Sequence, residues 1–284
     1  MNDPIQSLVS AEWLAANLNA PDLVILDASR HLPAANRDPH ADYEAAHIPG
    51  ARFLDLANLT DTASNVPQAL PNGAQLAERL ANLGVESGYR IILYDDSAVK
   101  TSARAWIALV AHGIGNVAIL DGGFAKWRGD GHPVESGTAE FEPANPFDLP
   151  QARGIRFKAD ILANLNSEAE QVLDARGADR VFGAGTDPIH GGENGRIPGS
   201  LNLPFGGVLN PDGTFKSPED LRAAFEGAGV DLSRPVITTC GSGITASVLL
   251  FALHLIGHES TALYDGSWSE WSADPETPKQ QGPQ

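Results

Sequence analysis

The sequence predicts an α/β protein built from two tandem copies of one domain, each a parallel sheet with helices on both faces. Short β-branched runs alternate with amphipathic stretches along the chain, which is typical of parallel sheets joined by crossover helices. In addition, four sequence patterns occur twice in the same order, at a spacing of about 145 residues, which is far too long for a solenoid repeat. The spacing therefore indicates a duplicated domain.

Each pattern of the first half has a counterpart in the second. The pairs are LVILDAS (23–29) with QVLDAR (171–176), HIPGARFLDL (47–56) with RIPGSLNLPF (196–205), YRIILYDDS (89–97) with RPVITTCGS (234–242), and LDGGFAKW (120–127) with LYDGSWSEW (263–271). These pairs predict an N-terminal domain over residues 1–136, a Pro-rich linker over 137–154, a C-terminal domain over 155–274 and a disordered polar tail over 275–284.

Single elements can be assigned from local signals. The stretches 72–85 and 217–230 are amphipathic and start at Asn72 and Ser217, which are favourable N-cap residues, so both are expected to be helices. The β-branched run 235–239 is expected to be a buried strand, and the apolar stretch 246–257 a packed helix.

Composition excludes several classes of protein. The net charge of −17 argues against a nucleic-acid partner, and no apolar run approaches the length of a membrane span. The amino terminus lacks the basic start and continuous apolar region of a targeting peptide. One cysteine allows neither an internal disulfide nor a multi-cysteine zinc site, so we expect a cytoplasmic protein without a bound metal.

That one cysteine, Cys240, lies between the predicted strand 235–239 and the predicted helix 246–257. Open α/β sheets bind their ligands at such turns, beyond the carboxyl ends of the strands. Backbone N–H groups of the turn and the positive end of the helix dipole favour an anion, so they should lower the pKa of the thiol and stabilise a persulfide. The residues expected to line this turn are Gly241, Ser242, Gly243, Ile244 and Thr245.

The sequence around Cys240 disfavours two other roles for this residue. A lone cysteine is most often a small buried hydrophobe, but the glycines around it would cost stability at a helix start unless access to the backbone is needed. A cysteine phosphatase needs an arginine six residues after the nucleophile, where this chain has Ala246. In the first half Asp95 aligns with Cys240, and a carboxylate cannot act as a sulfur nucleophile, so only the second half is expected to be catalytic.

The paired LDA(S/R), (H/R)IPG and DG(G/S)xxxW patterns, with one cysteine in the second half, resemble the tandem rhodanese sulfurtransferases. The turn CGSGITA is similar to the CGSGVTA turn of the 3-mercaptopyruvate members, whereas members that prefer thiosulfate carry basic residues after the cysteine. The resemblance implies that the Cys240 thiolate takes sulfur from 3-mercaptopyruvate, releases pyruvate and passes the sulfur to cyanide, a thiol or a thioredoxin-like protein. It implies no cofactor beyond the cysteine persulfide.

The resemblance also implies roles for residues outside the turn. A Ser, His and Asp group that manages protons in the family corresponds to Ser242, His47 and Asp38, although His47 could instead orient its turn and Asp38 could be a solvated loop charge. Arg180 matches an arginine that binds the donor carboxylate. The family's second substrate arginine is missing between residues 186 and 195, and Arg196 or His190 would have to replace it.

Two alternatives to a mercaptopyruvate sulfurtransferase stay open at this point. One is a thiosulfate:cyanide sulfurtransferase, which uses the same cysteine chemistry with a different donor. The other is a non-catalytic module in which Cys240 carries sulfur or is inert and the tandem fold binds a partner.

Overall fold

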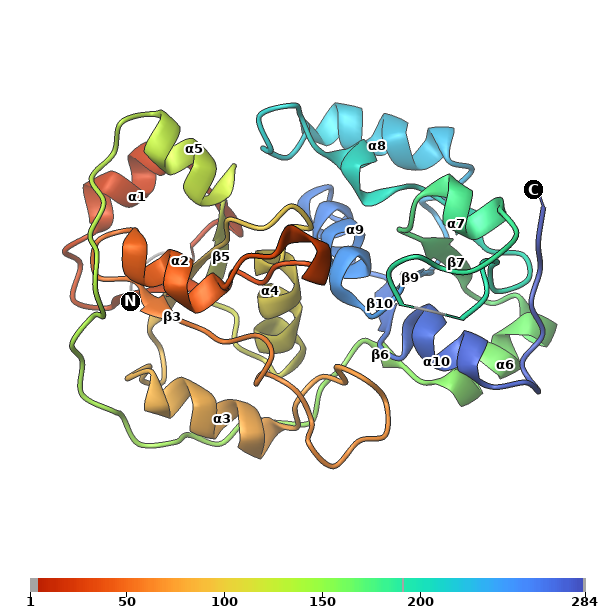
Figure 1. Cartoon of the computed structure of the whole chain (residues 1–284), viewed down its shortest axis with the longest axis horizontal. Helices are drawn as coiled ribbons and strands as arrows, with labels where there is room; N and C mark the ends of the chain where they lie inside the picture. Colours follow the sequence, from red (N-terminus) through yellow and green to blue (C-terminus); the bar gives the residue numbers. More distant parts are fainter. Residues whose placement is uncertain (1–4, 191, 283–284) are drawn as a thin grey trace. The chain divides into compact units, whose positions relative to one another are not determined.

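The computed structural model describes residues 5–190 and 192–282, and its contacts divide the chain into two compact units. Unit 1 comprises the residues up to Thr62, Leu70–Arg153 and Pro211–Thr214, and unit 2 comprises Ala63–Ala69, Gly154–Asn210 and the residues from Phe215 onward. Each unit contains one five-stranded parallel sheet with its own helices (Figure 1). The predicted α/β fold class is confirmed.

In unit 1 the strand order is β1-β5-β4-β2-β3, and all pairings are parallel. The strands are β1 (Leu8–Val9), β2 (Leu23–Asp27), β3 (Arg52–Phe53), β4 (Arg90–Tyr94) and β5 (Val117–Leu120). The helices are α1 (Ala11–Asn17), the 3-10 turn η1 (Pro33–Ala35), α2 (Pro39–Ala45), α3 (Gly73–Asn82), α4 (Ser102–Ala111) and α5 (Gly123–Gly129).

Unit 2 repeats this topology with the order β6-β10-β9-β7-β8, again all parallel. The strands are β6 (Ile155–Arg156), β7 (Gln171–Asp174), β8 (Leu201–Asn202), β9 (Val236–Thr239) and β10 (Thr261–Tyr264). The helices are α6 (Lys158–Ser167), α7 (Ala178–Phe182), the 3-10 turn η2 (Phe205–Val208), α8 (Pro218–Gly227), α9 (Ile244–Leu255) and α10 (Ser267–Ala273). The identical strand order supports the duplication read from the sequence.

The predicted helix starts agree with the structure at two positions. Asn72 accepts a hydrogen bond from Gln75 N at the start of α3, and the Gln75 side chain bonds back to Asn72 N, which completes a capping box. Ser217 caps α8 by accepting from Asp220 N. Helix α9 begins at Ile244, two residues before the predicted stretch, because the turn after Cys240 leads directly into it.

Helix α9 is the most buried helix of unit 2. Every residue from 246 to 253 is buried, which explains why this stretch is apolar on all sides rather than amphipathic. Helix α9 packs against β9 and β10. Since the core holds α9 along its length, the amino-terminal end of the helix, next to Cys240, is fixed in place.

The C-terminal tail differs from the sequence expectation, because residues 275–282 are ordered against unit 2. The side chain of Thr277 is buried and donates to Trp271 O at 2.5 Å, Trp271 Nε1 donates to Pro278 O at 2.9 Å, and Gln280 forms a β-bridge with Arg196. The prediction of a disordered tail is therefore wrong for residues 275–282. A polar composition does not indicate whether a segment forms hydrogen bonds with the folded domain. Residues 283–284 lie outside the described residues.

Among the described residues, we find no helix with the length and apolar character needed to span a bilayer.

Candidate active site

Cys240 lies at the carboxyl end of β9, where the chain turns toward α9. It follows Thr239, the last residue of β9, and only Gly241, Ser242 and Gly243 separate it from Ile244, the first residue of α9. The cysteine is 2% exposed and unpaired. Gly243 adopts φ +80° at the helix N-cap, a left-handed conformation that favours glycine. The turn thus brings the thiol to the helix amino terminus.

The amino-terminal part of α10 holds this turn. Trp268 N donates to Cys240 O at 2.9 Å, and Ser269 donates to Gly241 O through its backbone N and its hydroxyl at 3.0 and 2.5 Å. Cys240 N in turn donates to Ser267 Oγ at 3.3 Å. These four bonds give the DGSWSEW segment a role that the sequence did not reveal: it fixes the backbone of the cysteine turn.

The backbone donors of the turn remain available to an anion. Within the described residues, none of the N–H groups of residues 241–245 has a protein acceptor, and no hydrogen bond reaches Cys240 Sγ. Some of these groups belong to the first turn of α9, where N–H groups lack an intrahelical partner. Ser242 is buried within the turn, whereas Ile244 and Thr245 are partly exposed. The turn can therefore offer several N–H donors at one point.

A buried ion-pair network lies beside the turn. Arg176 follows β7 and pairs with Asp174, with Nη2 to Oδ2 at 2.7 Å, and its guanidinium lies 4.6 Å over the ring of Trp268. Asp187, whose side chain is fully buried, pairs with Arg180 of α7 at 2.6 Å. Because the backbone N of Trp268 donates to Cys240 O, the network and the cysteine turn are both in contact with this one residue.

Arg180, the predicted carboxylate ligand, belongs to this network. Its Nε and Nη2 donate to Asp187 Oδ2, and Nη2 also donates to His190 Nδ1 at 3.0 Å. Burial alone would raise the pKa of Asp187, but hydrogen bonds from Arg180 and from the N–H groups of Ile189 and His190 outweigh it and lower that pKa. Among the described contacts Nη1 of Arg180 has no protein acceptor, so this edge can meet a carboxylate.

The structure places Arg196, the other predicted substrate arginine, in different surroundings. Its guanidinium carbon lies 4.9 Å over the ring of Phe182, Nη1 donates to Ser200 O at 3.1 Å, and its backbone pairs with Gln280. These contacts brace the IPG turn and the tail. A substrate role for Arg196 stays a prediction.

His47 and Asp38 belong to unit 1, where the structure gives each a local contact. Asp38 caps α2 by accepting from the N–H groups of His40 and Ala41. His47 is buried, stacks on Tyr43 at 4.2 Å and forms a hydrogen bond between Nδ1 and Tyr43 O at 2.8 Å. Since a carbonyl only accepts, Nδ1 carries the proton and Nε2 is the acceptor of the neutral ring.

A comparison of the sequence with models of known protein families identifies the family of both units. The model of the rhodanese-like domain matches residues 10–130 and again residues 158–274. The chain belongs to the rhodanese family. The predicted family resemblance is confirmed.

Relatives of both donor types are similar to this tandem rhodanese along nearly its whole length. The 3-mercaptopyruvate sulfurtransferase of Mus musculus is 40% identical, with 94% of this chain and 92% of the relative covered. The thiosulfate sulfurtransferase of Mus musculus is 38% identical, with 98% and 96% covered. The crystal structure of the 3-mercaptopyruvate sulfotransferase SseA from Escherichia coli superposes with a TM-score of 0.84 at 34% identity, covering 94% of this chain and 100% of that one.

The two rhodanese domains differ at the residue that follows the central strand of the sheet, which is β4 in unit 1 and β9 in unit 2. Asp95 follows β4 as Cys240 follows β9. Its buried carboxylate accepts from Ser97 N at 2.8 Å and Ser102 N at 2.9 Å, and Phe124 N donates to Asp95 O much as Trp268 N donates to Cys240 O. The first domain thus satisfies its own turn with a carboxylate, which leaves those N–H groups unavailable to an external anion.

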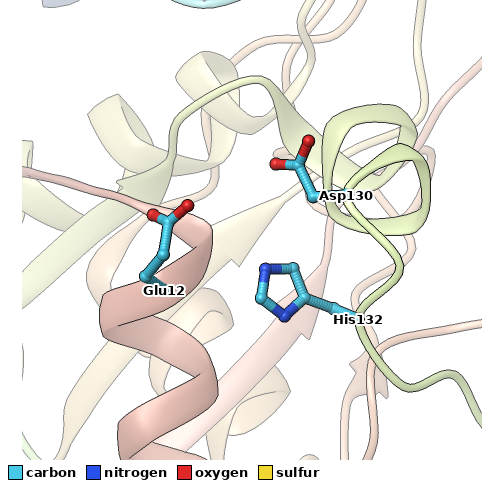
Figure 2. Close-up of side chains that lie close together, drawn as sticks. All are labelled: Glu12, Asp130 and His132. Carbon is cyan, nitrogen blue, oxygen red and sulfur yellow. The ribbon is translucent and has the colours of Figure 1, made fainter.

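One group of potential metal ligands occurs among the described residues of this rhodanese, in unit 1. Glu12 of α1 and Asp130 and His132 after α5 face one another (Figure 2), with ligand atoms within 4.8 Å. Asp130 is already paired with Lys126 at 2.9 Å, and His132 stacks on Trp127. We assign no metal to this exposed group.

Proposed function

We propose that this protein is a sulfurtransferase that moves sulfur from 3-mercaptopyruvate through Cys240 to a thiol or cyanide acceptor and releases pyruvate. The observation that carries the proposal is the uncharged CGSGIT turn at the start of α9, with a buried cysteine and backbone N–H groups that lack protein acceptors. Relatives named for this activity, 38 to 40% identical, support it.

The transfer proceeds in two displacements. The Cys240 thiolate attacks the donor sulfur, a sulfur–sulfur bond forms, and the carbon–sulfur bond breaks with its electron pair left on the pyruvate enolate. The proton of the transferred S–H passes to that enolate, which gives pyruvate and the persulfide anion Cys–S–S⁻. A cyanide or thiolate acceptor then attacks the outer sulfur, and the electron pair of the sulfur–sulfur bond returns to Cys240 as thiolate.

The turn suits the persulfide intermediate. Its outer sulfur carries negative charge, and N–H groups that face no protein acceptor can donate to it without prior rearrangement. The absence of a hydrogen bond to Sγ among the described residues supports a role for these donors at the outer sulfur rather than at the thiol. The reaction as written requires no cofactor.

A test of donor choice comes first, because a thiosulfate sulfurtransferase is also among the close relatives. We expect kcat/KM for 3-mercaptopyruvate, with cyanide as acceptor, to exceed that for thiosulfate by about tenfold or more, since an uncharged turn attracts a dianion less than a basic turn does. A preference for thiosulfate would assign the protein to that second activity. If neither donor reacts, a non-catalytic module is the better description.

We also propose that His47, Asp38 and Ser242 together relay a proton, with Tyr43 O rather than the Asp38 carboxylate orienting the His47 ring. The acceptor atom Nε2 of the neutral His47 ring suits this role. His47→Gln is expected to lower kcat by about 10²-fold and to change the pH profile of kcat. A variant with full kcat and an unchanged profile would remove His47 from the mechanism and leave it as a residue that orients its turn.

The acceptor and the compartment remain predictions from the sequence. We propose a small thiol, cyanide or a thioredoxin-like protein as acceptor, and a cytoplasmic location because the chain carries one free cysteine. A plant relative that is 31% identical is mitochondrial, so fractionation of cells expressing the full chain is the direct test of location.

A further inference from the structure

His190 lies directly against the cysteine turn. A Cβ atom added to Gly241 would come within 2.0 Å of Cε1, 2.4 Å of Nδ1 and 2.7 Å of Nε2 of the His190 ring. The imidazole therefore contacts the backbone of the residue that follows Cys240. Glycine at position 241 is required for this approach, because any other side chain would displace the ring.

The ring is held in one orientation by the ion-pair network. Nδ1 of His190 lies 3.0 Å from Nη2 of Arg180, and His190 N donates to Asp187 Oδ1 at 3.2 Å. A guanidinium only donates, so Nδ1 is the acceptor and the neutral ring carries its proton on Nε2. His190 thus presents an uncharged N–H group beside the turn.

The formal charges next to the turn cancel. Arg176 and Arg180 are balanced by Asp174 and Asp187. Burial, followed by the charge of Arg180 and Arg176, lowers the pKa of His190 against the opposing effect of Asp187, so the ring adds no charge at neutral pH. The turn residues 240–245 carry no basic side chain either.

We infer that His190 is a specificity-determining residue that keeps the surroundings of Cys240 uncharged, so that monoanionic sulfur donors with a carboxylate are preferred over dianionic donors. The inference rests on the proposed sulfurtransferase function and names the side chain that sets its donor class. When the charges of the site cancel, the single negative charge of a monoanionic donor can bind Arg180. The second negative charge of a dianionic donor has no basic partner among these residues. A permanent charge at position 190 would supply that partner.

The experiment compares donor ratios in three variants of the full chain. His190→Lys and His190→Arg place a fixed positive charge against the turn, and His190→Gln keeps the position uncharged with an oxygen that can accept from Arg180. Ile189→Lys is the matched control, because it adds the same charge at a neighbouring residue that is 44% exposed, whereas the His190 side chain is 21% exposed and lies against Gly241. For each, kcat/KM is measured with 3-mercaptopyruvate and with thiosulfate against cyanide.

We expect His190→Lys and His190→Arg to shift the ratio of the two kcat/KM values by at least about tenfold toward thiosulfate, since one unit charge a few ångströms away is worth that factor or more in a partly buried site. His190→Gln should keep the ratio within about twofold, and Ile189→Lys should do the same because solvent and salt screen its charge.

An unchanged ratio in both charged variants, or an equal shift in Ile189→Lys, would overturn the inference. Failure of the proposed function is a separate result, because it would appear in the wild-type protein itself, as a preference for thiosulfate or as reaction with neither donor. The ratio is also insensitive to the fraction of folded protein, since loss of folded protein lowers both kcat/KM values together.

Discussion

Cys240→Ser is expected to abolish sulfur transfer from either donor, with kcat reduced about 10⁴-fold or more, as when other covalent nucleophiles are removed. A serine hydroxyl is ionised far less readily than a thiol and cannot form a persulfide. Cys240 is the only cysteine, so wild-type protein incubated with donor alone should gain the mass of one sulfur atom, and the variant should gain none. Intact-protein mass spectrometry and steady-state kinetics measure the two results.

The variant should stay folded, because the side chains are nearly isosteric and the turn is held through backbone bonds from α10. We expect its free energy of unfolding to change by about 1 kcal/mol, as for an ordinary conservative substitution. A folded variant that retains wild-type turnover would exclude Cys240 as the sulfur carrier.

Arg180→Ala is expected to lower kcat/KM for 3-mercaptopyruvate by roughly 10²- to 10³-fold, the loss typical when one partner of a partly buried charge pair is truncated. The carboxylate does not change during the reaction, so its contact with Nη1 should stabilise ground and transition states alike. The effect should therefore appear in KM more than in kcat. An unchanged KM would remove Arg180 from the substrate site.

A control is needed because Arg180 also pairs with buried Asp187, and Arg176 would remain at 3.8 Å as its only other arginine partner among the described contacts. Arg180→Lys keeps the charge but loses the planar fork. We expect Arg180→Lys to fall between wild type and Arg180→Ala in KM while unfolding at a temperature close to that of wild type. A KM effect that followed thermal stability across the two variants would indicate damage to the network rather than to donor binding.

The turns after β4 and β9 show why one domain is suited to catalysis and the other is not. In unit 1 the residue after the strand is Asp95, and its carboxylate uses the N–H groups of Ser97 and Ser102. In unit 2 the residue is Cys240, and the N–H groups of residues 241–245 have no protein acceptor among the described residues. In unit 1 the N–H groups of the turn thus bond to a carboxylate of the same turn, whereas in unit 2 the N–H groups of the turn are available to bind an anion.

Much of this could be predicted because it depends on local pattern. Alternating β-branched and amphipathic runs specify parallel sheets, two caps mark the starts of α3 and α8, and the glycines around Cys240 mark the strand-to-helix turn. The tail was mispredicted for the same reason: its composition is that of a disordered segment. Its order comes from a hydrogen bond of the Trp271 indole to Pro278 O and from backbone hydrogen bonds between Gln280 and Arg196, which no local pattern encodes.

By itself, then, the sequence determined the family, the duplicated α/β fold and the cysteine at the head of α9. Only the tertiary structure decided what surrounds that cysteine. It shows the hydrogen bonds from α10 to the turn, the Nη1 atom of Arg180 that can bind a ligand, and the contact of His190 with Gly241. The physical reason is that strands and helices follow from periodicity along the chain, whereas residues 183–190 and 192–195 form no strand or helix and show no such periodicity. Its position depends on contacts with residues distant in sequence, such as Trp268 Nε1 with Glu193 O and Gly241 with the ring of His190, which form only when the fold has brought these residues together.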